Sequence, residues 1–130
     1  MPLAHIHVIK TAYTPDELRL IADTIYRTMR THFTAPDEDR YQMISQHEPY
    51  ELICSDTNLG FTRTERLIFL QVVQQGRSAA VKETYYGVLM AALKEKIGLG
   101  EGDLIISVTA NTREDWSFGG GKAQFLNGDL

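Results

Sequence analysis

The 130-residue sequence has little of what marks several large classes of protein. It contains one cysteine, Cys54, so an internal disulfide is excluded and a reducing setting is expected. No apolar run approaches the ~20 residues of a membrane-spanning helix, and the N-terminus lacks the charged and then apolar pattern of a secretion signal. A formal net charge of -4 gives no basic footprint for nucleic acid or for an anionic membrane. We therefore expect a cytoplasmic protein that binds neither.

The start of the chain, Met1-Pro2-Leu3, offers an unusual chemical group. A methionine before proline favours removal of the initiator, which leaves Pro2 with a free secondary amine. Such an amine can be a base, a proton donor or a Schiff-base nucleophile, depending on its protonation state. One proline in second position is weak evidence alone. Its use depends on whether the rest of the chain builds a pocket around it.

The order of the expected elements occurs twice along the chain. In each half a strand, a capped helix of about five turns and a second strand follow one another, with an offset of roughly 65 residues. The strands are predicted over 3–9, 41–45, 67–73 and 104–108, and the helices from Thr14 to near His32 and from Ser78 to Gly98. Between the halves, residues 46–60 are predicted to form a short hairpin and an irregular excursion.

This repetition predicts an α+β (α/β) fold in a single domain over residues 1–130. The pseudo-repeats, about 2–60 and 61–130, are two tandem β-α-β units that form a four-stranded sheet with both helices on one face. The strand LIFLQVV (67–73) is too apolar to leave the second face of the sheet in water. We therefore expect other subunits to cover that face, most simply in a closed ring.

Charged and polar side chains follow the elements that can reach Pro2. Asp39 and Arg40 come after the first helix, and Gln75 and Arg77 come after the central strand. An arginine holds a carboxylate in a bidentate fork, and an amine acts on a carbonyl. The group therefore suits a small carbonyl substrate that bears a carboxylate. The alternatives are a solvated loop for Asp39 and Arg40, and a structural ion pair for Arg40.

Two further motifs are weak evidence for a cofactor. His5 and His7 share one face of a strand, and His-x-His can hold a metal, but no third ligand is evident in the sequence. Gly119-Gly120-Gly121-Lys122 lacks the spacing of a phosphate loop and is interpreted as a turn. We predict no metal site and no cofactor.

Several motifs together span nearly the whole chain. They are Pro2, Asp39-Arg40-Tyr41-Gln42, Ser45-Gln46-His47, Asp56-Thr57, Leu59-Gly60, Arg77-Ser78, Asp115-Trp116-Ser117-Phe118-Gly119, Gly121, Ala123, Phe125-Leu126 and Gly128-Asp129-Leu130. This set resembles the malonate semialdehyde decarboxylase family of the tautomerase superfamily. The resemblance implies the β-α-β fold, a homotrimer and catalysis by the amino-terminal proline.

The resemblance also implies roles for individual residues. Pro2 matches the catalytic proline, Asp39 the active-site aspartate, and Arg77 one of two substrate-binding arginines. Gln75 stands where the family has its second arginine, which leaves the decarboxylase activity and the identity of the acid open. The residues implied as pocket walls are Trp116, Phe118, Phe125 and Leu130. Without the resemblance, Trp116 and Phe118 would be interpreted as core or interface residues.

Three functions are compatible with these residues. In the first, cationic Pro2 is the electrophile in decarboxylation of a 3-oxo acid such as malonate semialdehyde. In the second, neutral Pro2 is the base of a keto–enol tautomerase, which requires a lowered amine pKa. In the third, the chain is a catalytically weak trimeric binding module. Asp39 and the missing second arginine favour the cationic form and therefore the first function.

Overall fold

One four-stranded sheet and two long helices dominate the structure, a computed structural model that describes residues 2–130. The strands are β1 (Leu3–Ile9), β2 (Tyr41–His47), β3 (Ile68–Gln75) and β4 (Leu104–Asn111). The helices are α1 (Pro15–His32), α2 (Ala79–Ile97) and the short α3 (Gln124–Asn127), with 3-10 turns η1 (Pro49–Glu51), η2 (Glu101–Asp103) and η3 (Arg113–Asp115). No helix within residues 2–130 is long and apolar enough to cross a membrane.

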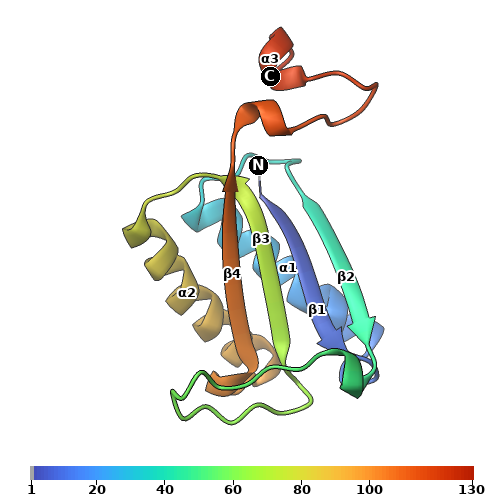
Figure 1. The fold of residues 1–130 in the computed structure, drawn as a ribbon, viewed down its shortest axis with the longest axis vertical. Coiled ribbons are helices and arrows are strands. Elements are labelled where there is room, and N and C mark those ends of the chain that lie inside the picture. Colours follow the sequence, from blue (N-terminus) through green and yellow to red (C-terminus); the bar gives the residue numbers. More distant parts are fainter. Residues whose placement is uncertain (1) are drawn as a thin grey trace.

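The sheet consists of two parallel pairs joined in an antiparallel way. β1 pairs with β2 and β3 with β4 in parallel, β1 pairs with β3 in antiparallel, and the strand order is β2-β1-β3-β4. α1 connects the first pair, α2 connects the second, and both helices lie on one face of the sheet (Figure 1). The predicted fold of two β-α-β units is confirmed.

Both long helices begin and end at the signals in the sequence. At α1 the Thr14 hydroxyl accepts from the Glu17 N–H and the Glu17 carboxylate accepts from the Thr14 N–H. At α2 the Ser78 hydroxyl accepts from the Val81 N–H, and Gly98 ends the helix at φ 67°, a left-handed conformation that glycine adopts without steric cost. These caps fix where each helix meets the sheet.

The hydrophobic core lies between the helices and one face of the sheet. Alternate strand residues point into it, as the period of two predicts. Its fully buried members include Ile6 and Val8 of β1, Ile68, Leu70 and Val72 of β3, Ile21 and Ile25 of α1, and Leu89 and Leu93 of α2. The core thereby holds the N-terminal end of β1 at a fixed place beside the end of β3.

The segment after β2 differs from the prediction. Residues 41–47 form one strand, and the expected hairpin over 46–60 is replaced by η1 and irregular chain. The reason is that Gln46 and His47 keep their register with β1, and Pro49 then begins a turn in which Glu48 and Glu51 cap each other. β4 is also longer than predicted, because its register with β3 extends to Asn111.

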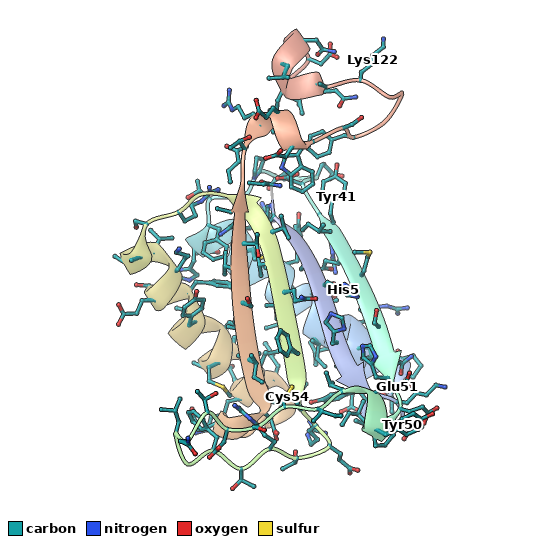
Figure 2. The ribbon with its side chains drawn as sticks, viewed as in Figure 1. His5, Tyr41, Tyr50, Glu51, Cys54 and Lys122 are labelled. Carbon is teal, nitrogen blue, oxygen red and sulfur yellow. The ribbon has the colours of Figure 1, made fainter. Side chains whose placement is uncertain are left out.

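No helix of residues 2–130 covers the second face of the sheet. Three histidines lie on it, and Figure 2 shows His5 on this face. His5 Nε2 lies 2.6 Å from Ser45 Oγ, and His7 bonds His47 at 2.8 Å and Gln71 at 2.7 Å. His47 was not predicted to lie beside the His5 and His7 pair; the parallel register of β1 and β2 puts it near His7. Within the described chain no group of His, Cys, Asp or Glu is arranged to hold a metal.

We expect the chain to lose stability as the pH falls below about 6.5. Burial, and then the charges of His7 and His47, lower the pKa of His5 from its ordinary 6.5. The unfolded chain therefore binds more protons, so the His5 contribution is present above 6.5 and is lost as the pH falls through the folded-state pKa. Urea unfolding of the wild type and of His5→Gln at about pH 7.5 and about pH 5 checks this. The variant should lose less free energy of unfolding than the wild type; equal losses would contradict the assignment.

Candidate active site

Pro2 is buried, directly precedes β1 and lies at the edge of a narrow cleft. The cleft lies between the N-terminal end of β1, the C-terminal half of α1 and the loop that leads into β2. Its walls are Pro2, Tyr26, Met29, Ala35, Asp39, Arg40, Tyr41 and Gln42. The structure therefore brings Pro2 and Asp39, two of the predicted site residues, to one place.

Asp39 reaches this place because the α1–β2 loop turns sharply. Glu38 adopts a left-handed conformation at φ 64°, which is uncommon for a residue other than glycine. Asp39 is 5% exposed. Burial raises its pKa, while the charge of the amino terminus and a hydrogen bond to it act in the opposite direction. Asp39 and Pro2 therefore face the same cleft.

Arg40, the neighbour of Asp39, has a structural role. Its Nη2 donates to Asp23 Oδ1 at 2.7 Å, its Nε donates to Gln42 Oε1 at 2.8 Å, and its guanidinium lies 4.7 Å from the ring centroid of Tyr26. These contacts tie the start of β2 to α1. The interpretation of Arg40 as a partner of a structural carboxylate is therefore confirmed.

Arg77 and Gln75 do not line the cleft around Pro2. The Arg77 guanidinium donates to three backbone carbonyls, those of Phe33 at 2.9 and 3.2 Å, Gln75 at 2.9 Å and Gly76 at 3.2 Å. It thereby ties the C-terminus of α1 to the β3–α2 loop. Gln75 is the last residue of β3, and strand alternation places it on the uncovered face, opposite the buried Gln74.

The aromatic residues near the C-terminus form one cluster above the end of the sheet. Trp116 and Phe118 stack with centroids 5.3 Å apart, and Phe125 meets Phe118 edge-on at 5.5 Å. The Trp116 indole donates to Asn111 Oδ1 at 3.1 Å. Figure 1 shows this segment beyond the end of the sheet where β1 begins. Leu130 is 63% exposed.

Tyr41 joins the aromatic cluster to the cleft. Its ring lies 5.5 Å from that of Phe118 and 6.4 Å from that of Trp116, and it also lines the cleft beside Pro2. Figure 2 shows Tyr41 at the end of the sheet next to the C-terminal segment. The sequence motif that contains Tyr41 did not predict this role. The signal was its place directly after Asp39 and Arg40, at the first position of β2.

Known proteins share this fold and sequence. The family model described as a tautomerase enzyme matches residues 39–119. The probable tautomerase YrdN of Bacillus subtilis (strain 168) is 36% identical over 130 residues, 100% of both chains. The probable tautomerase YusQ of the same strain is 29% identical over 97% of this chain and 99% of its own. The chain belongs to the tautomerase superfamily, a group of enzymes.

Solved structures similar to this chain include two malonate semialdehyde decarboxylases. A malonate semialdehyde decarboxylase with decarboxylase and hydratase activities is 35% identical, with a TM-score of 0.93 over 98% of both chains. The FG41 malonate semialdehyde decarboxylase, inhibited by 3-bromopropiolate, is 31% identical, with a TM-score of 0.92 over 98% of this chain and 97% of its own. A fused 4-OT, a symmetric trimer, shares the fold alone at 15% identity, with a TM-score of 0.76 over 97% of this chain and 98% of its own. The resemblance predicted from the motifs is confirmed.

Proposed function

We propose that this enzyme decarboxylates a small 3-oxo acid such as malonate semialdehyde, with the freed amine of Pro2 in its cationic form. The observation that supports this most is the buried Asp39, which lines the same cleft as Pro2. A carboxylate beside an amine favours the protonated amine. The similarity to two malonate semialdehyde decarboxylases supports the choice of substrate.

In this mechanism cationic Pro2 attracts the electrons of the breaking bond. It donates a hydrogen bond to the carbonyl oxygen of the substrate, or forms an iminium with the carbonyl carbon and releases water. The bond between the carboxylate carbon and C2 breaks, its electron pair moves to C2–C3, and carbon dioxide leaves. In the first route C2 takes a proton from Pro2 or water, which replaces the lost carboxylate. In the iminium route C2 takes its proton from water, and a water molecule then hydrolyses the iminium to release the carbonyl product and the Pro2 amine. Asp39 holds Pro2 in its cationic form during this sequence.

The walls of the pocket give the reaction a dry setting. Tyr41 already lies between the cleft and the aromatic cluster, so Trp116, Phe118 and Phe125 can close over a substrate that enters beside Pro2. Exclusion of water favours loss of charge from a carboxylate. In this proposal the wall residue Leu130 is exposed in a single chain because a neighbouring subunit covers it.

Arg77 and Gln75 are proposed as the contacts of the substrate carboxylate. Arg77 must turn some of its N–H groups away from the carbonyls of Phe33 and Gln75 to reach it. Gln75 supplies a neutral donor where an arginine would supply a charged one, and a charged hydrogen bond is about twice as strong. The carboxylate grip is therefore weaker than that of two arginines.

Replacement of this glutamine tests the proposed grip. We expect Gln75→Arg to raise kcat/KM for malonate semialdehyde by about tenfold, because a charge-assisted hydrogen bond replaces a neutral one. Carbon dioxide release is measured for both proteins. Gln46→Arg, at an exposed site on β2, adds the same charge elsewhere and should leave the rate unchanged. An unchanged rate in Gln75→Arg would mean that Gln75 does not contact the acid group.

A keto–enol tautomerase with neutral Pro2 is the second candidate. The names of the two Bacillus relatives, both probable tautomerases, favour it. A panel of malonate semialdehyde, an arylpyruvate and an acetylenic acid separates the candidates: decarboxylation must exceed enol conversion for the first proposal to stand. The third candidate, a catalytically weak binding module, predicts no turnover of any of them. Intact mass must also show that Met1 is removed, because a retained Met1 blocks amine catalysis.

We further propose that the protein is a homotrimer of single-domain chains in which the uncovered sheet face is the subunit interface. That face contains half-buried Leu3, Phe69 and Val73 beside exposed Met43, and apolar side chains of this size favour removal from water. The fused 4-OT with the same fold is a symmetric trimer. Sedimentation equilibrium should give three times the mass of one chain.

A lysine on the uncovered face tests the interface directly. Phe69→Lys should shift the sedimentation equilibrium towards the monomer, because it would bury an unpaired charge. Ile53→Lys, at a side chain that is 84% exposed, should leave the mass unchanged. A wild type that sediments as a monomer would contradict the trimer, and an intact trimer of Phe69→Lys would contradict the choice of face.

A further inference from the structure

Gln74 carries a buried side-chain amide that has no role in the mechanism proposed above. Its side chain is 0% exposed, and neither Oε1 nor Nε2 has a hydrogen-bond partner among residues 2–130. Buried side-chain amides are nearly always hydrogen-bonded, because an unpaired donor or acceptor loses its water without compensation. An amide with both ends unpaired therefore indicates a partner that belongs to the working state of the protein.

The strand register places Gln74 beside Pro2. Leu3 pairs with Val73 and Ala4 with Val72 across the antiparallel β1–β3 pair. One step beyond Leu3 and Val73 stand Pro2 and Gln74, and both are buried, as Ala4 and Val72 are, on the helix side of the sheet. The cleft with Asp39 is on the β2 side of Pro2, and Gln74 is on the β3 side.

Removal of Met1 creates the partner that Gln74 lacks. Within a chain, proline has no N–H to donate. As the first residue it has a secondary amine, with one N–H when neutral and two when protonated. Two N–H groups in a buried site need two acceptors. Before substrate binds, Asp39 on one side and Gln74 Oε1 on the other can supply them, and the substrate carbonyl then takes the place of one of these acceptors.

We propose that Gln74 is a positioning residue that accepts a hydrogen bond from the freed amine of Pro2 and so favours its cationic form. The proposal rests on the proposed function of Pro2 as the catalytic amine. Asp39 supplies the opposite charge, and Gln74 fixes the direction of the second N–H. The neutral amide leaves the charge of the site unchanged, so it acts through geometry and through the hydrogen bond alone.

The test replaces the amide by an apolar side chain of similar length. Gln74→Met should lower kcat for malonate semialdehyde by about tenfold and move the alkaline limb of the pH–rate profile about one pH unit towards acid, because the cation loses an acceptor. The same shift should appear in the titration of Pro2 followed by ¹⁵N NMR. Thermal unfolding is compared for wild type and Gln74→Met in the form that retains Met1. Gln74→Met should be equally or more stable in that form, since the substitution removes a buried amide that lacks the Pro2 amine as a partner.

Two control variants show whether an effect of Gln74→Met comes from the lost hydrogen-bond acceptor. Gln46→Met, at an exposed position, should change neither kcat nor the pH profile, and Gln74→Glu, which keeps an acceptor, should move the alkaline limb the other way. Unchanged kcat and pH limb in folded Gln74→Met, with activity still dependent on Pro2, would overturn the role of Gln74 alone. Full activity in Pro2→Ala would overturn the proposed function and this inference with it.

Discussion

Pro2→Ala should lower kcat/KM for a 3-oxo acid by about 10²- to 10⁴-fold, the range that a positioned proton-transfer or electrophilic group contributes. The expected loss follows from the place of Pro2, buried at the cleft that it shares with Asp39. A terminal alanine offers a primary amine, and without the ring its nitrogen rotates freely about the N–Cα bond. The variant therefore lacks both the secondary amine and the fixed orientation of its N–H groups. Initial rates of carbon dioxide release measure the effect.

The comparison needs proteins that differ only at this amine. Intact mass must show that Met1 is absent from both the wild type and Pro2→Ala. Pro15→Ala, at the exposed first position of α1, removes a proline far from the cleft and should retain full activity. Wild-type kcat/KM in Pro2→Ala would rule out both proline mechanisms.

Asp39→Asn should lower kcat/KM by about 10²-fold and move the alkaline limb of its pH profile towards acid. Asparagine keeps the shape of the side chain and removes the charge that favours the cationic amine. In the wild type, burial raises the pKa of the Asp39 carboxyl above its ordinary 3.8, so the acid limb should lie above that value and disappear in the variant. The pH dependence of kcat/KM measures both limbs.

The same substitution has a predicted effect on stability. A carboxyl whose folded-state pKa is raised stabilises the fold below its unfolded pKa of 3.8 and loses that contribution as the pH rises through the folded value. At neutral pH Asp39→Asn should therefore be at least as stable as the wild type. Asp37→Asn, in the same loop and paired with Arg30 at the surface, is the matched control and should keep full activity. An Asp39→Asn protein with wild-type activity would remove Asp39 from the mechanism.

The sequence predicted the parts of the fold that local patterns determine. The alternation in Leu3–Ile9 gave the correct buried face of β1, and Thr14, Ser78 and Gly98 gave the correct helix ends. Such signals depend only on residues that are near one another in the sequence, so they can be recognised without knowledge of the tertiary structure. The motif around Asp39 also predicted a place near Pro2, because loops at one end of a β-α-β unit converge.

Contacts between distant segments were harder to predict. His47 meets His7 because of the parallel register of β1 and β2, which a single sequence does not specify. Arg77 donates to the Phe33 carbonyl because α1 ends beside the β3–α2 loop, a consequence of packing. Packing between distant segments also places Tyr41 between the cleft and Phe118. In each case the partner lies more than 30 residues away, beyond the reach of periodicity.

The protonation state of Pro2 is the most direct test of the proposed mechanism. ¹⁵N NMR of a proline-labelled chain follows the amine of Pro2 as the pH is raised, since the other prolines have no ionisable nitrogen. We predict that the ammonium form persists above about pH 8, the ordinary value of an α-amino group, and that Asp39→Asn lowers this midpoint. A Pro2 amine that is already neutral at pH 7 would contradict the cationic mechanism and identify Pro2 as the base of a tautomerase.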